Sequence, residues 1–159
     1  MALIKGVNAY ATVDEAEAYF ANRLGVPNWI AADAPSKAQA LCTAALLLEE
    51  QKWTGTAISE TQPLAFPRAG QYFDPRLGTW LSFEDDVVPT RVVNASIEIA
   101  NHLLSNDGVL DDSGSVLNLS VSTIQLNTIK SAPQIPQIAA RMIKPLLINA
   151  GSNSWWRAN

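Results

Sequence analysis

Apolar residues recur every three or four positions in four stretches of the chain, a spacing that predicts four amphipathic helices. The first stripe consists of Val13, Ala16, Phe20 and Leu24. Thr12 and Glu15 have the spacing of a capping box at its start, and Gly25 supplies a common stop at its end. We therefore expect the first helix to run from Val13 to Leu24.

The second helix is expected to be the longest. A loop over Val26–Ala34 precedes it, Pro35 suits its first turn, and Gly55 ends it shortly after Trp53. Two adjacent stripes give it a broad face, formed by Leu41, Ala45 and Leu48 with Cys42, Leu46 and Glu49 beside them. A face this broad predicts contacts with two neighbouring elements.

Two more helices follow in the second half of the chain. Pro89 opens the third, which should run to about Leu104 and lie at the centre of the core. Its two neighbouring apolar rows are Val92, Ser96, Ile99 and Leu103, and Val93, Ile97, Ala100 and Leu104. The last helix should begin near Pro136, and Pro145 should kink it or end it early. Its expected stripe is Ile138, Met142 and Leu146.

Other segments read as extended. Aromatic residues flank a central Pro and Gly between Tyr72 and Leu81, which predicts a β-hairpin or an extended loop. Apolar residues alternate from Val116 and change phase near Ser122–Thr123, so a strand should continue there through a bulge or a turn. Asn106–Ser115 reads as a polar turn region. The chain should therefore fold as a mainly α domain over residues 1–148, with a small β hairpin or strand element, extended loops and a tail over 149–159.

The segment Gln62–Arg68, here called the strap, carries two prolines and cannot be helical. In an extended strap Leu64 and Phe66 share one face and can pack together. Arg68 has two open interpretations, a salt bridge or a solvated charge at a turn.

Composition narrows the possible functions. Hydrophobic residues make up 48% of the 159 residues, charged residues only 16%, and the net charge is −4. An acidic chain is a poor candidate for a protein whose affinity comes from neutralising phosphates. The charge is divided, because residues 84–112 hold seven acids and one base, whereas residues 113–159 hold four bases and no acid. In a ring, such a division would let the positive part of one subunit meet the negative part of the next.

Catalytic, metal and membrane signatures are not found in the sequence. His102 is the one histidine and Cys42 the one cysteine, and each lies within a helical pattern where a structural role is more common. The acids Glu84, Asp85 and Asp86 precede a helix, where they complement its dipole. We expect no enzyme activity, no cofactor, no metal and no membrane segment, and we expect the protein to be made in the cytoplasm.

Two aromatic segments are candidates for partner contacts. Trp155, Trp156 and Arg157 in the tail could form a docking peptide, or the tail could fold back on its own domain. Tyr72, Phe73, Arg76 and Trp80 could contact a neighbouring subunit or the next tail component. Few bases accompany Trp29, Trp53 and Trp80, which favours core or subunit contacts over base stacking.

Several segments occur in the order found in one protein group. They are Tyr10–Phe20, the helix over Lys37–Leu48 leading into Trp53-Thr54-Gly55, the strap Gln62–Arg68, and Asp86-Val87-Val88-Pro89. Over about residues 8–105 the chain resembles the head-tail connector, or adaptor, proteins of tailed bacteriophages. Some prophage relatives in this group are described as DnaT-like single-stranded-DNA-binding proteins.

The resemblance implies a four-helix adaptor-type bundle in the neck of a virion. Such a protein would form a homo-oligomeric ring, typically of twelve copies, below the portal protein and above a tail or next neck protein. Genomic DNA would pass through the lumen during packaging and ejection, and Trp155, Trp156 and Arg157 would dock on the portal. The alternative, which the second description of the group implies, is a single-stranded-DNA-binding accessory protein.

Overall fold

The computed structural model describes residues 2–105, 116–121, 124–129 and 135–148. Within these ranges the helices are α1 (Val13–Phe20), α2 (Pro27–Ala31), α3 (Ala34–Glu49), α4 (Thr90–Ser105), α5 (Gln137–Ile143) and the 3₁₀ turn η1 (Lys144–Leu146). The strands are β1 (Thr56–Ala57), β2 (Arg68–Ala69), β3 (Gln71–Asp74), β4 (Thr79–Ser82), β5 (Val116–Val121) and β6 (Ile124–Ile129). The fold is mainly α with small β elements, as predicted. The four expected helices are present and α2 is additional, so a four-helix bundle is not confirmed.

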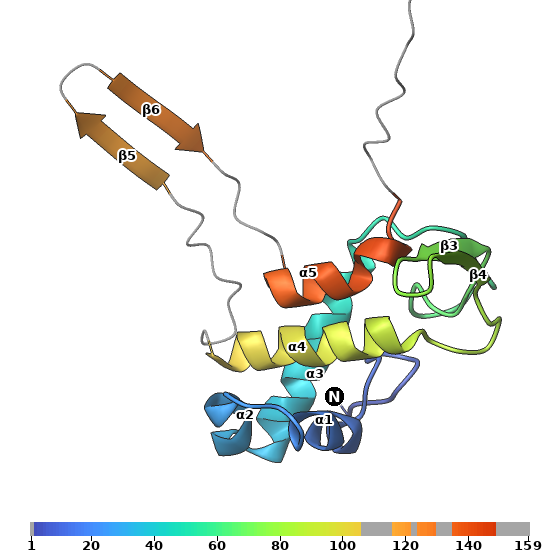
Figure 1. Cartoon of the computed structure of the whole chain (residues 1–159). Coiled ribbons are helices and arrows are strands. Elements are labelled where there is room, and N and C mark those ends of the chain that lie inside the picture. The colour runs from blue at the N-terminus through green and yellow to red at the C-terminus, as the bar shows by residue number, and fades with distance from the viewer. Residues whose placement is uncertain (1, 106–115, 122–123, 130–134, 149–159) are drawn as a thin grey trace, which may run out of the picture.

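The helix α4 lies at the centre of the helical body (Figure 1). It packs against α3 and α5 and also contacts α1 and α2. Its buried residues are Val92, Ala95, Ser96, Ile97, Glu98, Ile99, Ala100 and Leu103. The central position and both apolar rows are confirmed, although Val93 and Leu104 at the edge are only half-buried.

A buried carboxylate connects α4 to α1. Glu98 is 2% exposed, accepts a hydrogen bond from the Tyr19 hydroxyl at 2.7 Å and pairs with Arg23 Nη1 at 2.8 Å. Burial and then the hydrogen bond to Glu98 raise the pKa of Tyr19 to about 12. Because both carboxylate oxygens have partners, the cost of burying this charge is offset locally.

The strap supplies the aromatic centre of the core. Leu64 and Phe66 are both buried, as predicted from their alternation. The Phe66 ring makes edge contacts with Trp53, Phe83 and Tyr10, at centroid separations of 4.9, 5.7 and 6.4 Å. These rings come from widely separated positions in the chain, so Phe66 joins the N-terminal segment, the end of α3 and the β4–α4 connection. The Phe66–Pro67 peptide bond is cis.

Polar contacts fix the strap on both sides. The Arg68 guanidinium donates to the carbonyl oxygens of Gly55 at 2.7 Å, Thr54 at 2.9 Å and Ala65 at 3.2 Å. The predicted salt bridge of Arg68 is not found among the described residues, and its half-buried guanidinium is only partly solvated because it binds these carbonyls. Glu49 at the end of α3 accepts from the Ala65 amide at 2.8 Å and from the Tyr10 hydroxyl.

Several predicted boundaries and faces in the first half of the chain are corrected. The first helix ends at Phe20, and Leu24 is 95% exposed. The expected loop over Val26–Ala34 contains α2, because Pro27 occupies a first-turn position and Trp29 becomes fully buried. The second predicted helix ends at Glu49 and not near Trp53, and Leu46 is exposed while Ala40 and Ala44 are buried in its place.

The last helix is rotated by one residue from its predicted stripe. Within α5, Ile138 is exposed and Met142 is half-buried, whereas Ala139 and Ile143 are buried. Leu146, which lies in η1, is buried as predicted. Its end is as expected, because α5 stops at Ile143 and the chain continues as η1 around Pro145.

The β elements are three two-stranded antiparallel sheets within the described ranges. The predicted hairpin is confirmed by β3 and β4, which pair Phe73 with Trp80 and Asp74 with Thr79. The strands β5 and β6 pair Val121 with Ile124, so the chain reverses between these two residues. This favours the predicted turn over the bulge. Ser122–Thr123, the polar region Asn106–Ser115 and the tail over 149–159 lie outside the described residues.

We predict that Phe66→Ala lowers the free energy of unfolding by about 3–5 kcal/mol, the usual cost of removing a buried aromatic ring. Urea denaturation followed by circular dichroism measures this loss. The matched control is Phe73→Ala, because Phe73 is 43% exposed and should contribute much less. Equal losses for the two variants would contradict the central position of Phe66.

Candidate functional site

The β3–β4 hairpin presents different chemistry on its two faces. Asp74 faces the helical body and lines one pocket, whereas Phe73 and its cross-strand neighbour Trp80 line another on the opposite side, and Tyr72 borders both pockets. This division follows from the alternation of side chains along a strand. The hairpin therefore has an inner face that holds it in place and an outer face that is open to a partner.

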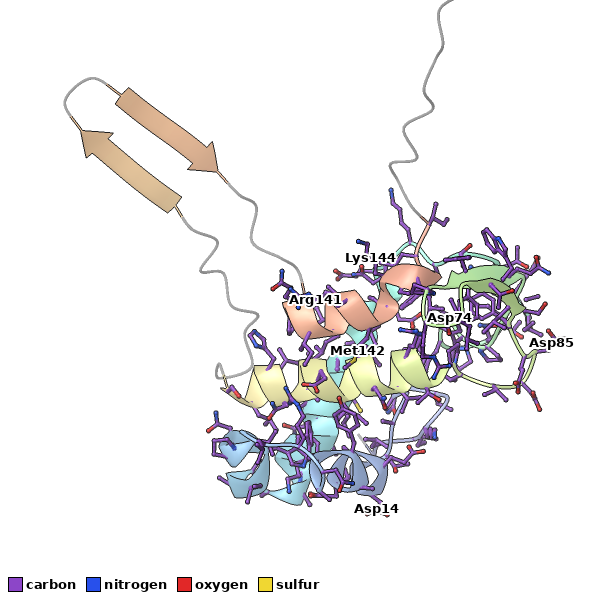
Figure 2. All side chains as sticks on the ribbon, in the orientation of Figure 1. Asp14, Asp74, Asp85, Arg141, Met142 and Lys144 are labelled. Atoms are coloured by element: carbon purple, nitrogen blue, oxygen red, sulfur yellow. The ribbon has the colours of Figure 1, made fainter. Side chains whose placement is uncertain are left out.

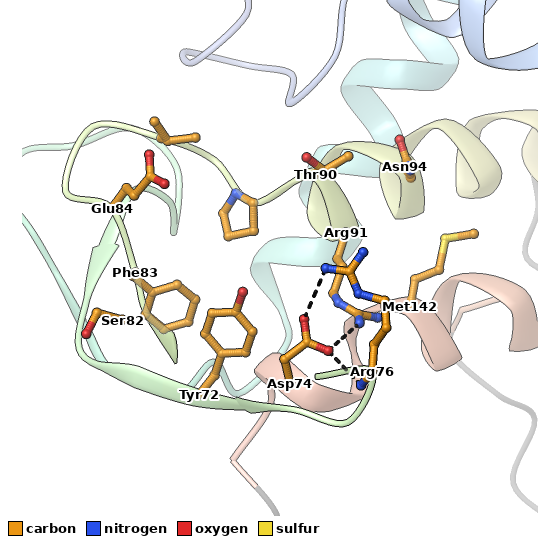
Figure 3. Close-up of a pocket in the computed structure, with 12 residues that line it drawn as sticks. Tyr72, Asp74, Arg76, Ser82, Phe83, Glu84, Thr90, Arg91, Asn94 and Met142 are labelled. Carbon is orange, nitrogen blue, oxygen red and sulfur yellow. Dashed lines mark hydrogen bonds and ion pairs between the residues drawn. The ribbon is translucent and has the colours of Figure 1, made fainter. Parts of the chain in front are cut away.

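Asp74 organises the inner face (Figure 3). The carboxylate is almost fully buried, accepts from the Arg76 backbone amide at 2.8 Å, and accepts from Arg91 Nη2 at 3.1 Å. The exposed Arg76 guanidinium lies 3.8 Å from the second carboxylate oxygen. Since Arg91 belongs to the first turn of α4, this ion pair fixes the hairpin to the central helix.

A pocket of about 590 Å³ lies between the inner face and the start of α4. Tyr72 stacks on Phe83 at one wall, with ring centroids 4.9 Å apart. Two bases and two acids line the pocket, namely Arg76 and Arg91, and Asp74 and Glu84. Because these charges balance, the pocket has no clear preference for an anion or a cation.

The outer face carries an exposed aromatic pair. The rings of Phe73 and Trp80 meet edge to face with centroids 5.8 Å apart, and Trp80 remains 65% exposed. A groove of about 440 Å³ separates them from η1 and the residues that follow it. Its lining residues are Thr54, Gln71, Tyr72, Phe73, Pro75, Trp80, Lys144, Pro145, Leu147 and Ile148. None of them is acidic, and Lys144 contributes a positive charge.

Further bases lie near this groove. Figure 2 shows Arg141 and Lys144 on the side of the α5–η1 segment that faces away from α4, and both side chains are exposed. Arg76, in the turn of the hairpin, lines the inner pocket near Asp74 and does not line the groove. Around the outer face, Lys144 and Arg141 therefore place positive charge beside aromatic surface in a chain that is acidic overall.

The structure brings together four predicted contact residues and leaves three undescribed. Tyr72, Phe73, Arg76 and Trp80 all belong to the hairpin, although Tyr72 turns inward onto Phe83. Trp155, Trp156 and Arg157 lie outside the described residues.

Sequence reasoning missed Asp74, Arg91 and Lys144. Arg91 offered a signal, because it is the one base among seven acids over residues 84–112. Pro145 was expected only to end the last helix, and the position of Lys144 and Pro145 beside Trp80 depends on long-range packing.

Among the described residues no group of three or more His, Cys, Asp or Glu side chains could hold a metal ion. Cys42 is half-buried, and burial raises the pKa of its thiol. None of the described helices combines the length and apolar character required to cross a membrane.

Comparison with known families gives one match that spans most of the chain. The family model described as "Putative DnaT-like ssDNA binding protein" matches residues 2–158. The chain belongs to this family. Comparisons with curated proteins and with solved structures gave no match. The head-tail connector identity implied by the resemblance is not supported by these comparisons.

The family match extends well beyond residues 8–105, where the resemblance was strongest. It includes both the β3–β4 hairpin and the α5–η1 segment, which together form the groove. The family assignment therefore covers the whole candidate site.

We predict that Asp74→Asn destabilises the protein near neutral pH. The Arg76 amide, followed by the charges of Arg91 and Arg76, holds the pKa of Asp74 below its usual range. A lowered folded-state pKa contributes stability above the unfolded value of about 4, and this stability is lost as the pH falls through the folded value.

Urea unfolding at a series of pH values tests this prediction. The difference in stability between wild type and Asp74→Asn should be largest near neutral pH and should shrink below about pH 4. Glu84→Gln is the matched control, since this exposed acid lines the same pocket. A difference for Asp74→Asn that is constant with pH would show that the ionised carboxylate is not responsible.

Proposed function

We propose that this protein is an accessory protein that binds single-stranded DNA through the outer face of the β3–β4 hairpin. The observation that carries the proposal is the groove at Phe73 and Trp80, which combines exposed aromatic rings with Lys144 and has no acidic lining residue. Proteins that bind single strands use aromatic side chains as stacking platforms and basic side chains for the backbone. The family description supports the same function.

The acidic net charge of the chain limits how much of the DNA affinity can come from contacts with phosphates. With a net charge of −4 and few bases near the groove, little affinity can come from phosphate neutralisation. Stacking should supply most of it. We therefore expect a preference for single strands over duplexes and a shallow dependence on salt.

Fluorescence anisotropy with a labelled oligodeoxythymidylate tests the proposal, using a strand longer than the about 4–16 nucleotides that such sites commonly cover. We predict binding to this strand, weaker binding to a duplex of equal length, and a slope of log K against log salt of about −0.7 to −1.4, because one or two bases, Lys144 and its neighbour Arg141, contribute about −0.7 each. No binding to the single strand would contradict the proposal. Equal binding to both forms with a steep slope would also contradict it.

A second candidate is the connector role that the resemblance implies, and its support is the position of the exposed apolar residues. Leu24 precedes α2 and Ile30 lies within it, whereas Phe73 and Trp80 lie on the hairpin. The helix α2 and the hairpin lie at different ends of the helical body (Figure 1). A head-to-tail ring requires two different complementary surfaces on each subunit. In this role twelve copies would form a ring in the virion neck, after synthesis in the host cytoplasm.

In the connector role the portal protein would bind Trp155, Trp156 and Arg157, and the hairpin would contact a neighbouring subunit or the next tail component. Neither candidate assigns a catalytic step to the protein. Particle imaging separates the two candidates, because a ring at the portal vertex is required by the second and unexplained by the first. Unchanged portal binding after deletion of residues 149–159 would remove the docking role of the tail.

A further inference from the structure

We propose that the groove between the β3–β4 hairpin and η1 is a pocket for a single unstacked nucleobase. In this arrangement the base packs on Trp80, and Lys144 contacts an adjacent phosphate. The inference rests on the proposed binding of single-stranded DNA and specifies the site, the part of the ligand that enters it and the residues that hold it.

The dimensions and walls of the groove suit a planar ring. Its volume of about 440 Å³ falls within the range of about 300–1,000 Å³ typical of small-molecule sites. Phe73 and Trp80 form one wall, and Pro145, Leu147 and Ile148 form part of the other. Thr54 and Gln71 add polar side chains that can meet the hydrogen-bonding edges of a base.

Backbone pairing holds the wall opposite the hairpin in place. The Thr54 amide donates to the Leu146 carbonyl at 2.9 Å, and the Ile148 amide donates to the Lys52 carbonyl at 2.8 Å. Trp53 and Leu147 form an antiparallel bridge between these two bonds. Because Asp74 also ties the hairpin to α4, both walls are positioned before a ligand binds.

Trp80 is 65% exposed in the part of the chain that the structure describes. Its ring meets Phe73, which is itself 43% exposed, while Trp29 and Trp53 are buried. An exposed indole beside a lysine, in a groove without acids, fits a base and its phosphate better than an acidic or basic peptide. A base within a duplex remains stacked on its neighbours, so the pocket selects single strands.

Trp80→Ala tests the pocket, with anisotropy measured on a labelled oligodeoxythymidylate. We expect affinity to fall about 5- to 150-fold, which corresponds to about 1–3 kcal/mol for one stacked base. Trp80→Phe should retain most of the affinity. Lys144→Ala should reduce the magnitude of the salt slope by about 0.7, the contribution of one phosphate contact on a single strand. Circular dichroism and the urea midpoint check that each variant is folded.

Two matched controls isolate the role of the base. Leu77→Ala removes another exposed apolar side chain of the hairpin that does not line the groove, and it should leave affinity unchanged. An abasic oligonucleotide of equal length has the same backbone charge but cannot stack. Wild type should bind the abasic strand as weakly as Trp80→Ala binds the intact strand. Trp80→Ala should bind the abasic strand no more weakly than it binds the intact strand.

Different results would contradict the nucleobase pocket and the proposed binding of single-stranded DNA. If wild type binds single strands but Trp80→Ala and Leu77→Ala behave alike, the pocket is wrong while the proposed function stands. If wild type binds no single strand, both are wrong. If Trp80→Ala disrupts self-association without weakening DNA binding, the groove is a contact between copies of the protein and the nucleobase pocket is excluded.

Discussion

Burial of the Phe66 ring is the interaction on which the rest of the structure depends. The strap holds this ring between Tyr10, Trp53 and Phe83, so one side chain joins segments that are far apart in the sequence. Proline on both sides of the strap's apolar residues limits the backbone, and Arg68 binds three carbonyl oxygens that would otherwise need other donors. The strap also fixes the position of the β3–β4 hairpin. The strand β3 begins two residues after β2, which lies at the end of the strap, and Phe83, which contacts Phe66, directly follows β4.

From this centre the two faces of the hairpin take separate roles. The inner face is fixed by the buried Asp74 and its pair with Arg91 on α4. The outer face keeps Phe73 and Trp80 exposed beside Lys144. Exposed aromatic rings on a two-stranded hairpin keep their positions only if other contacts hold the backbone that carries them. The ion pair on the inner face supplies such a contact for the rings of the outer groove.

The sequence predicted the elements better than their faces. Val92, Ser96, Ile99 and Leu103 were placed correctly because α4 is long and contacts neighbours on several sides. Ile138 was placed on the wrong face because α5 is only seven residues long, and so short a pattern fits more than one rotation. Leu24 was assigned to a helix by spacing alone, although the chain leaves the helix after Phe20. For the site, the aromatic residues of the hairpin could be predicted, but Lys144 could not, since only tertiary packing brings η1 beside Trp80.

The pairing of Asp74 with Arg91 has a mechanical consequence. A two-stranded hairpin alone is compliant, yet this one is anchored at its inner face to the first turn of the central helix. Glu98 on the same helix bonds Tyr19 on α1 and pairs with Arg23. One helix therefore anchors the hairpin near its start and the N-terminal helix further along, so the outer face of the hairpin and the N-terminal part of the fold share a single support.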